Sequence, residues 1–128
     1  MSLFSIFYLL LLHWVADFIC QTDWEAKNKS TNNEALISHT SMYSIITFGG
    51  LIIYAIIAAT SSLDTISVGS ILLFTAVTFV THTFIDYYTS RVNSYFWQKK
   101  DSHNFFVSVG FDQVLHYVQL FLCFKYIL

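Results

Sequence analysis

The sequence of 128 residues predicts an all-α protein: a four-helix transmembrane bundle made of two antiparallel hairpins, with a polar His/Asp cluster in its cytoplasmic half. Hydrophobic residues make up 55% of the chain and charged residues only 11%, whereas soluble domains contain about 25% charged residues. Four apolar runs each approach the ~20 residues that a bilayer-spanning helix needs. The chain contains no proline, which suits long helices without kinks.

The apolar runs predict one domain, residues 1–128, with helices at about 2–21, 32–60, 65–97 and 105–126. The first run lacks a basic amino-terminal region and contains Asp17, so we interpret it as a retained helix and not as a cleaved signal peptide. After a polar loop, Thr31 and Glu34 have the spacing of a capping box and predict the start of the second helix.

Two further loops separate the remaining helices, and their charges predict the orientation. A short break is expected at Ser61, Ser62 and Asp64, and another loop at about residues 100–104. The first and third loops hold nearly all of the positive side chains, namely Lys27, Lys29, Arg91, Lys99 and Lys100. The positive-inside rule therefore predicts that these loops are cytoplasmic and that both termini are outside. No basic patch suggests nucleic acid as a partner.

Polar residues recur at helical spacing inside the apolar runs. His13, Asp17 and Gln21 lie four residues apart, which places them on one helix face. The third helix repeats the His-x-x-x-Asp pattern, the fourth inverts it as an antiparallel helix requires, and the second adds a single histidine. Together these groups are His13, Asp17, His39, His82, Asp86, Asp112 and His116. Counted from the helix ends, all seven fall at a similar depth, about 12 Å inside the cytoplasmic boundary at ~1.5 Å per residue.

Imidazole and carboxylate groups at one depth predict a site for one or two divalent metal ions, with Zn first and Mn or Fe as alternatives. All seven residues are candidate ligands, and Asp17, Asp86 and Asp112 are also candidate catalytic carboxylates. Arg91 and Gln21 are candidate substrate-binding residues, because they lie near the cytoplasmic end of their helices. The alternative without a metal is a buried network of ion pairs that holds the helices together.

The segments HWVADFICQTDWEAKNKS, SHTSMY, THTFIDYYTSR and DQVLHY carry a family resemblance. With them the chain resembles, over nearly its whole length, the small membrane proteins of bacteria and phages grouped as domain of unknown function 3307. The resemblance implies a membrane protein of bacterial or phage origin and implies no activity.

Three functions remain open on the sequence alone, so whether the protein is an enzyme is not decided at this stage. The first is a metal-dependent hydrolase that acts on a lipid or an amphipathic phosphoester. The second is a metal-ion or proton-coupled transporter, in which a homo-oligomer could complete a pathway that the outer halves of the helices lack. The third is a non-enzymatic phage membrane factor with a structural polar core.

Overall fold

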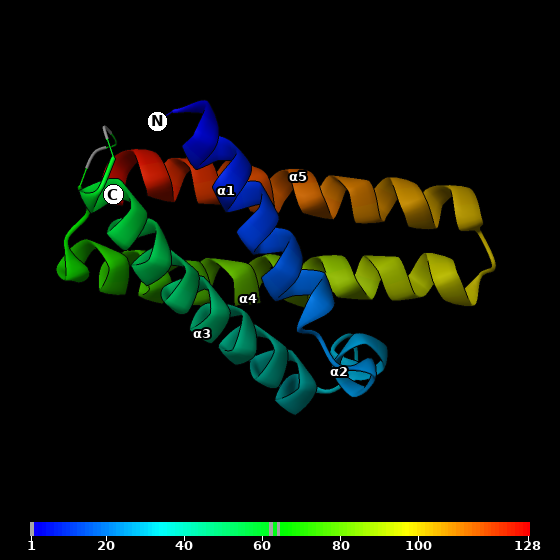
Figure 1. Cartoon of the computed structure of the whole chain (residues 1–128). Helices are drawn as coiled ribbons and strands as arrows, with labels where there is room; N and C mark the ends of the chain where they lie inside the picture. Colours follow the sequence, from blue (N-terminus) through cyan, green and yellow to red (C-terminus); the bar gives the residue numbers. More distant parts are fainter. Residues whose placement is uncertain (1, 62, 64) are drawn as a thin grey trace.

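The computed structural model describes residues 2–61, 63 and 65–128, and the described part of the chain contains helices and no strands (Figure 1). The all-α prediction is therefore confirmed. The elements in order are α1 (Leu3–Trp14), the π-helix η1 (Val15–Ile19), α2 (Asp23–Asn28), α3 (Asn33–Ala59), α4 (Val68–Gln98) and α5 (Ser102–Ile127). Of the break expected between the second and third helices, Ser62 and Asp64 lie outside the described residues.

The amino-terminal helix differs from the expectation of one α-helix over residues 2–21. It changes to π-helical geometry at Val15, and the Cys20 amide donates to the Val15 carbonyl oxygen over 2.9 Å, five residues back. The helix ends there, so Gln21 lies in the connection that follows and not on the helical face that it was expected to share with Asp17.

A short helix occupies the stretch that was expected to be a solvated loop. Thr22 and Glu25 form a capping box in which each side chain accepts a hydrogen bond from the backbone amide of the other residue, and this pair begins α2. The capping box predicted at Thr31 is wrong, because Asn32 caps α3 through the Glu34 amide. Glu25 is buried and accepts a second hydrogen bond from the Ser38 hydroxyl of α3, which fixes α2 against that helix.

The long helices pack along one another, and the shorter ones cover them. In Figure 1, α4 and α5 run side by side in opposite directions, while α1 and α3 cross them obliquely. Contacts join α3 to α4 and α1 to both α3 and α5. At Gly50 of α3, a Cβ would overlap the Leu12 side chain of α1, so a glycine permits this close crossing.

The interior has an apolar part and a polar part. The apolar part lies toward the chain termini and consists of Leu9, Leu51, Ile71, Phe74, Leu120 and Cys123. The polar part lies toward the α4–α5 connection and contains four histidines that are at most 1% exposed. Many large apolar side chains face outward instead, such as Ile45, Val80 and Phe111. Buried polar groups beneath an apolar exterior are the distribution expected in lipid and not in water.

Three helices, α3, α4 and α5, are long and apolar enough to cross a membrane. The first apolar segment, Leu3–Ile19, is shorter than these three.

Candidate metal centre

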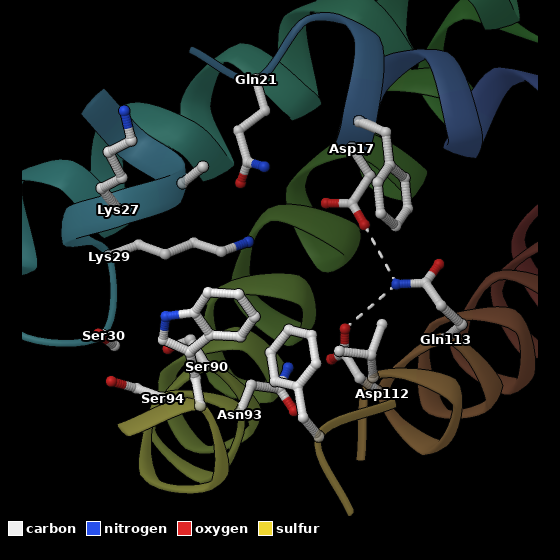
Figure 2. A pocket seen from close by; sticks show the side chains of 15 residues that line it. Asp17, Gln21, Lys27, Lys29, Ser30, Ser90, Asn93, Ser94, Asp112 and Gln113 are labelled. Atoms are coloured by element: carbon white, nitrogen blue, oxygen red, sulfur yellow. Dashed lines mark hydrogen bonds between the residues drawn. The ribbon is translucent and has the colours of Figure 1, made fainter. Parts of the chain in front are cut away.

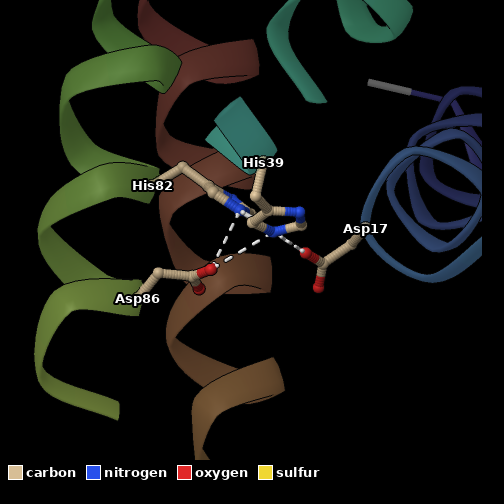
Figure 3. A group of neighbouring side chains, drawn as sticks. All are labelled: Asp17, His39, His82 and Asp86. Atoms are coloured by element: carbon tan, nitrogen blue, oxygen red, sulfur yellow. Dashed lines mark hydrogen bonds and ion pairs between the residues drawn. The ribbon is translucent and has the colours of Figure 1, made fainter. Parts of the chain in front are cut away.

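Four buried side chains from three helical segments converge on one point (Figure 3). Asp17 comes from the π-helical turn η1, His39 from α3, and His82 and Asp86 from successive turns of α4. None of the four is more than 4% exposed. One ligand atom from each residue lies within 4.8 Å of the ligand atoms of the other three.

The spacing of these atoms resembles a tetrahedral ligand shell. Four ligands at about 2.1 Å from a zinc ion lie about 3.4 Å from one another. The Nε2 atom of His39 lies 3.0 Å from Asp17 Oδ1 and 3.2 Å from Asp86 Oδ2. The Nε2 atom of His82 lies 3.4 Å from the same Asp17 oxygen and 3.7 Å from the same Asp86 oxygen. The two Nε2 atoms are 3.5 Å apart. Five of the six distances between pairs of these four ligand atoms are thus close to those of a zinc site.

Hydrogen bonds cannot account for all of these contacts. A ring nitrogen carries either one proton or one lone pair, so it makes one good hydrogen bond. His39 Nε2 nevertheless has three polar neighbours within 3.5 Å: the two carboxylate oxygens and the His82 nitrogen. A cation at the centre would satisfy all four ligand atoms at once.

A second group of potential ligands adjoins the first and shares Asp86 with it. Asp112 and His116 lie one turn apart on α5, and together with Asp86 they could also hold a metal ion. His116 Nε2 is 3.0 Å from Asp86 Oδ1 and 3.3 Å from Asp112 Oδ1. The two oxygens of Asp86 therefore face different groups.

His13 belongs to neither group, although the sequence predicted it as a ligand. Its Nε2 atom is 3.0 Å from the amide oxygen of Gln113, and its Nδ1 atom is 2.9 Å from the Tyr43 hydroxyl. An amide oxygen only accepts, so Nε2 carries the proton and Nδ1 accepts from Tyr43. With both nitrogens engaged, His13 orients Gln113 instead. The Gln113 amide then donates to Asp17 and to Asp112 (Figure 2).

Lys29, at the end of α2, also belongs to the site, although its position in a polar loop of the sequence predicted that it would be solvated. Its Nζ atom lies 2.8 Å from Asp86 Oδ2. Burial alone would lower the pKa of the Lys29 ammonium, but the Asp86, Asp17 and Asp112 carboxylates outweigh it and hold the pKa above its ordinary value. Lys29 is therefore charged at neutral pH. The Thr-x-x-Glu pattern at Thr22 and Glu25 is the sequence signal that could have revealed the helix that carries it.

A cavity of about 570 Å³ opens beside these groups (Figure 2). Asp17, Asp112 and Gln113 line its inner end, and Lys29 and Gln21 also line it. Its remaining polar lining residues are Lys27, Ser30, Ser90, Asn93 and Ser94, and its large apolar ones are Phe18, Trp97, Phe105 and Val109. The cavity gives a small molecule access to the carboxylates.

The two residues predicted to bind substrate are placed differently. Gln21 lines the cavity, and its buried Oε1 atom has no hydrogen-bond partner in the described part of the chain. Arg91 is not among the lining residues, and its guanidinium lies over the Tyr87 ring, 3.6 Å from the ring centroid.

These features define a helical protein with membrane-compatible spans and a buried His/Asp cluster beside a cavity. The family model described as "Protein of unknown function (DUF3307)" matches residues 5–128, and the chain belongs to this family. The family resemblance seen in the sequence is thereby confirmed. Comparisons with curated proteins and with solved structures gave no match.

Proposed function

We propose that this protein is an integral membrane, metal-dependent hydrolase that acts on a lipid or an amphipathic phosphoester. The spacing of the four ligand atoms of Asp17, His39, His82 and Asp86 carries the proposal, because a divalent ion explains it and hydrogen bonds do not. Imidazole and carboxylate ligands suit Zn, Mn or Fe.

The membrane assignment follows from the distribution of apolar side chains. The three long helices meet the length requirement, and α1 with η1 adds an apolar segment of about 25 Å at ~1.5 Å per residue. Together these four segments form a bundle that spans the membrane four times. The Lys and Arg residues of the first and third loops support an orientation with the metal centre in the cytoplasmic half and both termini outside.

The cavity suits an amphipathic anion. Lys29 and Lys27 supply positive charge on the side of α2, where a phosphate group would be held. Trp97 and Phe105 supply apolar surface on the side of the α4–α5 connection, where an acyl or isoprenyl chain would lie. A substrate with a charged head and an apolar tail would contact both regions.

A divalent ion held by the His and Asp side chains beside the cavity would lower the pKa of a bound water and polarise a phosphoryl oxygen. The oxygen of the attacking water forms the new bond to phosphorus, and the bond from phosphorus to the leaving alcohol breaks. A carboxylate that lines the cavity, Asp17 or Asp112, accepts the proton of the water and returns it to the leaving oxygen. Lys29 pairs with the phosphoryl oxygens and neutralises their charge.

The position of the apolar cluster favours hydrolysis over transport. Leu9, Leu51 and Phe74 are at most 2% exposed and lie between the His/Asp groups and the end of the molecule where the termini lie. An ion that continued past the centre would have to cross this packed layer, and an unsolvated charge there is costly.

The test is phosphate release from dioctanoyl phosphatidate by the detergent-purified protein, with Zn²⁺ or Mn²⁺ added and with a chelator. We expect activity that depends on metal and is lost, together with bound metal, in His82→Gln. Lys29→Gln should raise KM about tenfold or more, since a charge-assisted hydrogen bond contributes ~1.5–3 kcal/mol. The matched control is Lys99→Gln, since this exposed lysine does not line the cavity. Equal activity with and without chelator would contradict the proposal.

A further inference from the structure

Asp86 presents its two carboxylate oxygens to different partners. Oδ2 faces the Lys29 ammonium at 2.8 Å and His39 and His82 at 3.2 and 3.7 Å, and Oδ1 faces His116 at 3.0 Å. The carboxylate is only 2% exposed, so both oxygens lie away from water. A carboxylate in this position can bridge two cations that lie about 3.5–4 Å apart.

In the second group of potential ligands, Asp86, Asp112 and His116, hydrogen bonds again cannot account for all of the contacts. His116 Nε2 has two carboxylate oxygens within 3.3 Å and at most one proton to share between them. Asp112 Oδ1 is buried and makes no hydrogen bond within the described residues, although it lies beside this nitrogen. An unpartnered carboxylate oxygen in the interior is costly unless a cation binds it.

The two groups differ in the number of ligands that the protein supplies. The first has four and forms a closed tetrahedron, which is typical of structural zinc. The second has only Asp86, Asp112 and His116, and Asp112 lines the cavity. Three protein ligands with one position open are typical of a catalytic ion.

From this geometry we infer that the cluster holds two divalent ions bridged by Asp86, and that the ion bound by Asp112 and His116 faces the substrate. This inference rests on the metal centre of the proposed function and assigns the two ions different roles. The ion of the first group holds η1, α3 and α4 together. The ion of the second group is the one that contacts the phosphoester.

The experiment loads the purified full-length protein with Mn²⁺, counts bound metal by mass spectrometry and records electron paramagnetic resonance spectra. The wild type should bind two equivalents and show the multiline signal of coupled Mn²⁺ ions. His116→Gln and the isosteric Asp112→Asn should each retain about one equivalent with an uncoupled signal. His103→Gln, at an exposed histidine of α5, is the matched control and should keep both ions.

Gel filtration identifies any variant that has lost its fold, and Asp112→Asn keeps the result interpretable if His116→Gln does not fold. If the wild type binds one equivalent of Mn²⁺, the inference of a second ion is wrong and the first centre stands. If it binds no Mn²⁺, both the inference and the proposed metal centre are wrong. Two coupled ions without phosphate release would support this inference and contradict the hydrolase.

Discussion

At the scale of single residues, Asp86 has four polar neighbours, and three of them lie around the same carboxylate oxygen. Lys29, His39 and His82 approach one oxygen, and His116 approaches the other. Around it, His13 bonds to Gln113, and the Gln113 amide donates to Asp17 and to Asp112. The candidate ligands are thus joined to residues that position them, and Asp86 is the central member of the cluster.

Asp86→Ala should lower both the bound metal and the thermal stability. It removes a ligand and leaves the Lys29 ammonium without its partner, and breaking a buried charge pair costs about 3–5 kcal/mol. Metal analysis and thermal unfolding in detergent measure the two effects. His103→Ala should change neither, because this side chain is exposed. Full metal occupancy in Asp86→Ala would favour the alternative of an ion-pair network without metal.

At the scale of elements, the π-helical turn and the crossing of α1 over α3 decide where Asp17 lies. Tyr8 of α1 donates a hydrogen bond of 2.7 Å to the Gly50 carbonyl oxygen, and Leu12 lies against the same glycine. Asp17 follows within two turns, in η1. π-helical turns occur often at functional sites because they reorient a side chain without ending the helix. The glycine contact therefore helps to position Asp17 in the candidate metal centre.

Gly50→Val should destabilise the protein by about 1–3 kcal/mol and weaken metal binding, because the new side chain overlaps Leu12 and pushes α1 away. Thermal unfolding and metal titration measure the two effects. Gly49→Val is the matched control, since a Cβ at Gly49 meets nothing within 4 Å. Similar losses in both variants would show that the loss comes from valine in the helix and not from the crossing.

At the scale of the whole molecule, charge and exposure are distributed unevenly. The α4–α5 connection lies at one end of the molecule, and the chain termini lie at the other (Figure 1). The cavity lining includes Trp97 and Phe105, which are close to the α4–α5 connection in the chain. The exposed surface of the long helices is rich in large apolar side chains. This distribution fits a membrane orientation with the cavity open toward the cytoplasm.

Labelling with a membrane-impermeant maleimide tests that orientation in intact bacterial cells. In a background that carries Cys20→Ser, Thr65→Cys should react from outside, because the proposed orientation puts the α3–α4 connection on the outer face. Lys100→Cys should react only after the cells are permeabilised. Both positions are exposed, so burial does not explain a difference. Reaction of Lys100→Cys in intact cells would reverse the orientation.

The sequence by itself determined the helical class, the family and the recurrence of His and Asp at four-residue spacing. These are local properties, because apolar run length and helical period depend only on neighbouring residues. They also gave the set of polar residues from which the centre is built, but not the role of each member.

Only the tertiary structure decided which of these residues meet. His13 and Asp17 share a helix face, yet the first bonds to Tyr43 and Gln113 and the second faces His39 and His82. Lys29, expected in solvent, lies against Asp86 because α2 folds back onto α3 through Glu25 and Ser38. Crossing angles, a π-helical turn and a short capped helix set these contacts. They depend on packing between segments far apart in the chain, which the spacing of residues along one helix does not specify.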